Sequence, residues 1–273
     1  MKMKSWKQII GVGLATIGLA AILTGCVSDT GSTASATELP KKIVVGLDDN
    51  FPPMGFRDEQ GNLVGFDIDI AKEAAKRAGM EIEFKPIDWS SKEAELRSKH
   101  IDVLWSGLSI TAEREKNILF SKPYLKSTQI IIVRDDSTIK GKEDLKDKIV
   151  ATQQGSHVEP LVEADKERYG FKTVKTYGDV INAFMDLELG RIDALVVADD
   201  VGKYNMTKNP GKFKITEGTY GSDMSGIGFR LGDTVLKAKF DDILKEMIAD
   251  GTFDAIAIKW FGDATKVNRE AFK

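Results

Sequence analysis

The chain has 273 residues, of which 42% are hydrophobic and 30% are charged. These values are typical of a soluble globular protein with one large or two medium domains. The formal net charge is −3, and three of the lysines lie within the first seven residues. The rest of the chain is therefore more acidic, which argues against a nucleic acid as partner.

The N-terminus has the pattern of a targeting segment. Three lysines precede a short apolar run over residues 9–23, and no acidic residue interrupts them. The run is too short for a typical membrane span and predicts a secretory signal over residues 1–25.

The end of this signal has a recognisable motif, Leu23-Thr24-Gly25-Cys26. It resembles the bacterial lipoprotein signal, which implies cleavage before Cys26 and attachment of lipid to that residue. Residues 26–39 are small and polar, so they predict a flexible tether. We expect a lipid anchor, a tether and a globular body at the outer face of the membrane, which is an extracytoplasmic location.

The first part of the body alternates strands and helices. Apolar patterns predict strands at residues 42–47, 81–86 and 101–105, with helices at 68–79 and 89–98 between them. Short alternating units of this kind are typical of a parallel sheet covered by helices.

A β-rich run at residues 127–133 leads into a second series of the same kind. Its predicted elements are strands at 149–152, 172–177 and 192–197 and helices at 155–169 and 178–190. A β run at 227–230, an amphipathic helix at 234–250 and a last helix ending at 262 follow.

This order of elements predicts an α/β protein with two lobes. We expect a mostly parallel sheet flanked by helices in each lobe, and two β crossings that act as a hinge. The predicted division is lobe 1 from residues 40–132 and 228–273, and lobe 2 from residues 133–227.

Residues 106–114, SGLSITAER, indicate a site for a carboxylate. Small residues with free amides and hydroxyls follow a buried strand, and an arginine comes shortly afterwards. A guanidinium matches a carboxylate with two parallel hydrogen bonds. Because this loop and residues 153–157 and 198–200 all follow predicted strands, we expect them to meet in a cleft between the lobes.

Five segments of the body resemble the amino-acid-binding solute-binding proteins of polar amino acid ABC importers. They are VGLDDNFPPMGF (45–56), GNLVGFDIDIAKEAAKRAG (61–79), IDVLWSGLSITAEREKNILFSKPY (101–124), GRIDAL (190–195) and IKWFG (258–262). The resemblance implies a two-lobed periplasmic-binding-protein-like II fold that closes around an amino acid and delivers it to a membrane permease.

The resemblance also implies roles for particular residues. Arg114 and Ser109 would bind the ligand α-carboxylate, and Gly107 would present its carbonyl to the α-ammonium. Ser156 and His157 would open a helix in lobe 2 and offer amides to the same carboxylate. The remaining implied contacts are aromatic walls from Phe51 and Trp89, and a group that reads the ligand side chain, Asp48.

One position departs from the family pattern. The family places an aspartate five residues after the aspartate of its GR-x-D motif, where it pairs with the α-ammonium. Counted from Asp193, that position here is Ala198, followed by Asp199 and Asp200. We predict that a one-residue bulge brings Asp199 into the site, with Asp200 as the alternative.

A non-catalytic binding protein is the leading hypothesis, and a cyclohexadienyl dehydratase-like enzyme on the same fold is the alternative. Asp48 and Asp49 beside an aromatic wall favour a cationic ligand side chain, although a polar neutral one such as glutamine or cystine stays open. The sequence has no His/Cys cluster, so we predict no metal and no cofactor. A monomer is the expected state for a protein that docks on a permease.

Overall fold

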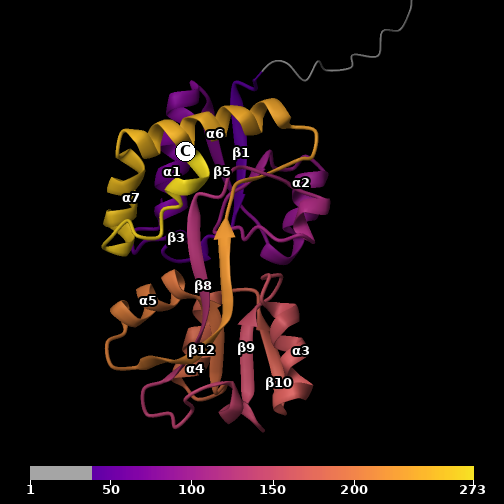
Figure 1. The fold of residues 1–273 in the computed structure, drawn as a ribbon, viewed down its shortest axis with the longest axis vertical. Helices are drawn as coiled ribbons and strands as arrows, with labels where there is room; N and C mark the ends of the chain where they lie inside the picture. The colour runs from indigo at the N-terminus through magenta and orange to yellow at the C-terminus, as the bar shows by residue number, and fades with distance from the viewer. Residues whose placement is uncertain (1–38) are drawn as a thin grey trace, which may run out of the picture. The chain divides into compact units, whose positions relative to one another are not determined.

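The computed structural model describes residues 39–273 of the chain. The predicted signal segment, Cys26 and all but the last residue of the predicted tether lie outside the described residues. The described body contains two five-stranded sheets, each covered by helices, and one small three-stranded sheet (Figure 1).

The first sheet belongs to lobe 1. Its strands lie in the order β5 (Glu81–Pro86), β1 (Lys42–Leu47), β6 (Val103–Leu104), β13 (Gly228–Phe229) and β7 (Leu119–Phe120). β1 pairs in parallel with β5 and β6, whereas β13 pairs antiparallel with β6 and β7. Alternate β1 residues Ile43, Val45 and Leu47 are fully buried, as the apolar run predicted.

Helices cover this sheet and complete its core. They are α1 (Phe66–Ala78), α2 (Lys92–Arg97), α6 (Thr234–Ala249) and α7 (Thr252–Phe261). α1 ends at Gly79, whose φ of 69° lies in the left-handed region that glycine adopts without strain. Trp105 packs in this core together with Phe66, Tyr124 and Phe240.

The second sheet belongs to lobe 2. Its strands lie in the order β10 (Thr173–Tyr177), β9 (Ile149–Gln153), β11 (Ala194–Ala198), β8 (Leu125–Arg134) and β12 (Phe213–Ser225). Its helices are α3 (Glu159–Tyr169), α4 (Val180–Glu188) and α5 (Asp199–Lys208). β9 pairs in parallel with β10 and β11, and β8 pairs antiparallel with β11 and β12.

Each sheet is therefore mixed rather than mostly parallel. The expected parallel pairing holds for β1, β5 and β6 in lobe 1 and for β9, β10 and β11 in lobe 2. These strands alternate with helices, and helical crossovers leave successive strands parallel. The other strands are β8 and β12, which pass between the lobes, and β7 and β13 of lobe 1, and they add antiparallel neighbours.

Several elements have no counterpart in the sequence prediction. β12 was missed because most of its residues are exposed or half-buried, so apolar and polar positions do not alternate along it. The small sheet of β2 (Asn50–Phe51), β3 (Gly55–Arg57) and β4 (Leu63–Val64) was assigned to a loop. α5 was missed as well, and its first residues lie beside the site.

β8 and β12 form the two crossings. Their pairing runs from Leu125↔Ser225 to Arg134↔Phe213. Leu125 packs in the lobe 1 core and Ile130 in the lobe 2 core, so the first crossing lies between these two residues. The lobe boundaries at residues 132 and 227 stay predictions.

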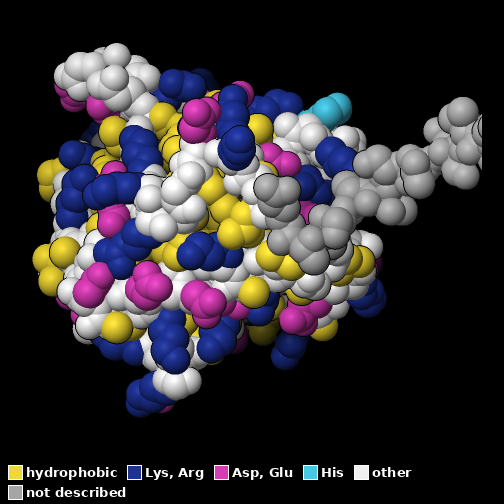
Figure 2. All heavy atoms as spheres, turned by 90° about the horizontal axis from the view of Figure 1, so that it is seen from above, with side chains coloured by type: hydrophobic (Ala, Val, Ile, Leu, Met, Phe, Trp, Pro, Cys, Tyr) yellow, Lys and Arg dark blue, Asp and Glu magenta, His cyan; other side chains and the backbone are white. Residues whose placement is uncertain are grey.

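Figure 2 shows one face of the body, seen from above the view of Figure 1. On the described atoms of this face, Lys and Arg side chains are interspersed with Asp and Glu side chains. A continuous basic patch of the kind that tracks phosphates is not seen there. Within residues 39–273, none of the helices combines the length and the apolar character needed to cross a bilayer.

Candidate functional site

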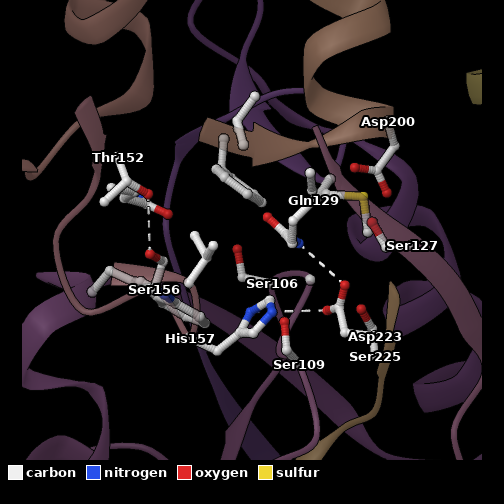
Figure 3. A pocket seen from close by; sticks show the side chains of 18 of the residues that line it. Ser106, Ser109, Ser127, Gln129, Thr152, Ser156, His157, Asp200, Asp223 and Ser225 are labelled. Carbon is white, nitrogen blue, oxygen red and sulfur yellow. Dashed lines mark hydrogen bonds and ion pairs between the residues drawn. The ribbon is translucent and has the colours of Figure 1, made fainter. Parts of the chain in front are cut away.

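A cavity lies where loops of both lobes meet (Figure 3). Eight of the nine predicted site residues line it, namely Asp48, Phe51, Trp89, Gly107, Ser109, Arg114, Ser156 and His157. Asp199 does not line it, whereas its neighbour Asp200 does. The prediction that three loops converge between the lobes therefore agrees with the structure.

Arg114 is a buried cation at one side of this cavity. It begins the short 3₁₀ helix η2 (Arg114–Lys116) and is 7% exposed. Its Nη1 donates to the carbonyl of Ser109 at 2.9 Å, and its Nη2 donates to the carbonyl of Gly155 at 3.0 Å. A guanidinium has five N–H donors. Since neither partner is a carboxylate, the remaining donors can bind an anion in the cavity.

Burial lowers the pKa of Arg114 from its ordinary value, with smaller opposing effects from Glu93 and Asp223. The guanidinium stays charged at neutral pH because an arginine side chain is effectively always protonated in proteins. A buried cation without a paired carboxylate is unfavourable. A ligand carboxylate would supply the missing charge.

Gly107 is held by the buried carboxylate of Asp67. The Gly107 amide donates to Asp67 Oδ2 at 2.6 Å, and Tyr124 Oη donates to Asp67 Oδ1 at 2.8 Å. Burial raises the pKa of Asp67 to about 7, against these two hydrogen bonds. Gly107 has φ 57°, and a Cβ there would lie 3.3 Å from the Phe51 ring, so a side chain would crowd the cavity.

Ser156 and His157 line the cavity but do not open a helix. α3 begins at Glu159, after a turn at Gly155, whose amide donates to Glu159 Oε2 at 2.6 Å. The Ser156 amide is used within this turn, where it donates to the carbonyl of Gln153 at 3.2 Å. The predicted helix start at residue 155 was therefore wrong, and the hydroxyl of Ser156 is the group that it presents to the cavity.

His157 forms part of a polar chain in the cavity. Its Nδ1 lies 3.9 Å from Asp223 Oδ2, and Gln129 Nε2 donates to Asp223 Oδ1 at 3.1 Å (Figure 3). Burial lowers the pKa of His157, which favours the neutral imidazole at neutral pH. Asp223 and Gln129 were missed because both lie on the crossing strands, where the sequence pattern predicted no site.

The two adjacent aspartates after β11 have different environments. Asp199 Oδ1 accepts hydrogen bonds from Lys266 Nζ at 2.5 Å and from the Thr128 amide at 3.2 Å, and Asp199 Oδ2 accepts one from Lys203 at 2.8 Å. Asp200 is buried and its Oδ1 accepts from the Val201 amide at 2.8 Å. No bulge forms, because Asp199 begins α5 directly after β11.

This geometry corrects the choice between the two carboxylates. Asp199 is satisfied by two lysines away from the cavity, whereas Asp200 lies in its lining. Successive helical residues point about 100° apart, so only one of them can face the cavity. The structure places Asp200, and not the predicted Asp199, in the lining of the cavity.

A third carboxylate lies beside the aromatic walls. Asp48 Oδ1 accepts from the Asn50 amide at 2.9 Å, and Asp48 Oδ2 accepts from Gln153 Nε2 at 2.6 Å. Burial raises the pKa of Asp48 to about 6, opposed by these two hydrogen bonds. Phe51 and Trp89 supply apolar surface to the same cavity.

The two lobes touch across the cavity, so the structure is a closed form. Lys92 of lobe 1 donates to the carbonyl of Gly155 at 2.8 Å, next to the bond from Arg114. A Cβ on Gly155 would lie 2.9 Å from the Ser90 Cα. The Gly155 turn of lobe 2 therefore lies in close contact with the Ser90 segment of lobe 1. Gln153 and Asp48 make a further bond between the lobes.

Among the described residues no group of three or more His, Cys, Asp or Glu side chains is arranged to hold a metal ion. The cavity instead combines one guanidinium, three carboxylates, several hydroxyls and two aromatic rings. These are groups that bind a small charged organic molecule by hydrogen bonds and ion pairs.

Two α/β lobes with one charged cavity between them define a two-lobed binding protein. Residues 43–263 match the bacterial extracellular solute-binding proteins, family 3. The chain belongs to this family.

Characterised relatives cover most of the chain. The L-cystine-binding protein TcyJ of Escherichia coli (strain K12) is 34% identical over 82% of this chain and 84% of its own length. The arginine-binding extracellular protein ArtP of Bacillus subtilis (strain 168) is 33% identical over 95% of this chain and 98% of its own. A solved ancestral arginine-binding protein bound to arginine is 41% identical, with a TM-score of 0.78, and covers 82% of this chain and 100% of its own.

Proposed function

We propose that the protein binds an L-amino acid with a cationic side chain, with L-arginine as first candidate, and delivers it to the permease of an ABC importer. The observation that carries the proposal is the buried Arg114, whose guanidinium faces the same cavity as the carboxylates of Asp200 and Asp48. Arg114 would bind the ligand carboxylate, Asp200 its α-ammonium and Asp48 its side chain.

The charge of the cavity favours a cationic ligand. Asp48, Asp200 and Asp223 line it opposite a single guanidinium, while burial favours neutral His157. A buried zwitterion needs a partner for each charge. After one carboxylate pairs with the ligand ammonium, the remaining acids are best balanced by a second cation on the ligand. Relatives that bind arginine support this choice.

The first test is a thermal-shift screen of the body against the common amino acids, cystine and ornithine. A ligand at about a hundred times its dissociation constant stabilises the folded state by about 2.7 kcal/mol, which raises Tm by several degrees. We expect the largest shifts from L-arginine and other basic amino acids. Shifts from neutral amino acids alone would contradict the basic side chain, and no shift at all would contradict amino acid binding.

Asp48→Asn should weaken binding of the basic amino acid by about thirtyfold or more, since truncating a buried charge pair costs at least about 2 kcal/mol. Binding of a neutral amino acid such as L-glutamine should change much less. Calorimetry with both ligands measures the difference. The exposed Glu59→Gln is a control that removes one carboxylate outside the cavity, and an equal loss for both ligands would contradict the side-chain role.

The same residue predicts the pH dependence of the wild type. The ligand cation binds the ionised carboxylate, and Asp48 holds its proton below about pH 6. Affinity for L-arginine should therefore fall as pH drops through about 6, by about tenfold per unit, and Asp48→Asn should remove this part of the fall.

We also infer that the protein acts by binding alone, as its relatives' names describe. Asp200 and Asp48 are assigned to the two cationic groups of the ligand, and the third cavity carboxylate, Asp223, accepts a hydrogen bond from Gln129. Formation of product on incubation with prephenate or arogenate would contradict this and favour the dehydratase alternative.

We also expect the protein to be a monomer in light scattering, with or without ligand.

Attachment to the outer face of the cell membrane through Cys26 remains a proposal from the sequence. Cells expressing the full chain should incorporate labelled palmitate into the wild type, and Cys26→Ser should abolish incorporation and release the protein into the medium. Equal labelling of both proteins would contradict lipid attachment at this residue.

A further inference from the structure

The segment after α7 approaches the site beyond the residues that the family model matches. Lys266 follows the family match, which ends at residue 263. Its carbonyl accepts a hydrogen bond from the Lys126 amide at 2.8 Å, and Val267 forms a bridge with Leu125. These contacts fix Lys266 beside the start of β8, where the chain crosses to lobe 2.

The side chain of Lys266 reaches both aspartates at the start of α5. Its Nζ lies 2.5 Å from Asp199 Oδ1 and 3.9 Å from Asp200 Oδ2. The Lys266 side chain is only 18% exposed. This is therefore a shielded ion pair between the C-terminal segment and lobe 2, where charges interact more strongly than at a free surface.

Asp200 needs a positive neighbour, because its surroundings otherwise disfavour a charge. It is 6% exposed and lines the cavity (Figure 3). The charged and titratable groups that act on it are Lys266, Asp199, Asp223, Asp67 and Tyr124. Burial raises the pKa of Asp200, Lys266 lowers it, and Asp199 and Asp223 raise it. Lys266 is thus the one cation of this group.

We propose that Lys266 is a positioning residue of the ammonium subsite: it holds Asp199 away from the cavity and keeps the neighbouring Asp200 ionised to face the ligand. This inference rests on the proposed function, since it assumes an amino acid whose α-ammonium pairs with Asp200. It explains how two adjacent acids can act differently. Asp199 pairs with Lys203 and Lys266, and Asp200 is available to pair with the ligand.

The test compares Lys266→Met with Lys266→Arg and with a matched control, Lys259→Met. Lys259 lies on α7, forms a 2.6 Å ion pair with Asp69 and is 60% exposed, so its loss changes the net charge equally outside the site. Binding of L-arginine and of its analogue without the α-amino group is measured by calorimetry or by competition. Circular dichroism and Tm without ligand verify folding.

Lys266→Met should weaken L-arginine binding by up to about tenfold, the limit that corresponds to one pKa unit at Asp200. The loss relative to the wild type at the same pH should approach this limit as the pH is lowered. It should shrink as the pH is raised, because Asp200 is then ionised in both proteins. The analogue without the amino group should change by less than about threefold, a small effect on the same scale. Lys266→Arg and Lys259→Met should bind L-arginine nearly as the wild type does.

A double substitution gives an independent readout. In an Asp200→Asn background, Lys266→Met should cause no further loss, because the carboxylate through which it acts is gone. Unchanged affinity of Lys266→Met, or an equal loss for L-arginine and its analogue, would overturn the inference and leave the proposed function standing. Absence of L-arginine binding by the wild type would overturn the proposed ligand, and this inference with it.

Discussion

Arg114→Ala should reduce affinity for the amino acid by about a hundredfold to several thousandfold, or about 3–5 kcal/mol. The guanidinium is buried and its only partners in the described residues are the carbonyls of Ser109 and Gly155. Without it, the ligand carboxylate would enter a cavity lined by three aspartates with no cation to meet it. Calorimetry on the purified body measures the loss directly.

The fold should survive this substitution. Arg114 is a buried cation whose pKa is lowered by burial, so its removal relieves an unfavourable charge while it breaks two hydrogen bonds. We expect a small change in Tm without ligand and loss of the ligand-induced shift. Arg114→Lys should recover only part of the affinity, because an ammonium cannot make the paired bonds of a guanidinium.

Arg97→Ala is the matched control, since Arg97 is exposed on the nearby α2. It should bind as the wild type does. If Arg114→Ala retained affinity within about tenfold, or about 1.4 kcal/mol, the assignment of the carboxylate subsite would be wrong.

Asp200→Asn should have the second largest effect, a loss of about thirtyfold to a thousandfold in affinity for any L-amino acid. The substitution keeps the size of the side chain and removes the charge that would pair with the α-ammonium. Because Asp200 is buried and its pKa is raised by burial, the substitution should not lower stability without ligand. The effect should be the same for basic and neutral ligands, which separates it from that of Asp48→Asn.

The neighbouring Asp199→Asn provides the comparison. It breaks ion pairs with Lys203 and Lys266, so its main expected effect is a lower Tm without ligand. Affinity should fall by at least tenfold less than in Asp200→Asn. The reverse order would show that Asp199, as the sequence first suggested, meets the ligand ammonium.

Local pattern and the family resemblance predicted much of the fold and eight of the residues that line the cavity. β1 and β5 have the predicted bounds, because β1 is a short β-rich run and β5 alternates apolar with charged residues. The loop from Ser106 to Arg114 was recognisable because its small residues and its arginine are close in sequence. Contacts between residues distant in sequence could not be predicted in this way. The hydrogen bond from the Gly107 amide to the Asp67 carboxylate was missed for this reason.

The sequence by itself determined the two-lobed α/β class, the loops that meet between the lobes and eight of the cavity residues. The class and the loops follow from periodicity and short motifs, which act over a few residues, and the eight site residues were implied by the resemblance to the family. The tertiary structure decided that Asp200 rather than Asp199 faces the cavity, that Asp223 joins it from a crossing strand, and that Lys266 pairs with α5. The reason is physical: the start of α5 sets the direction of each carboxylate, and packing of the C-terminal segment against β8 brings the lysine to them.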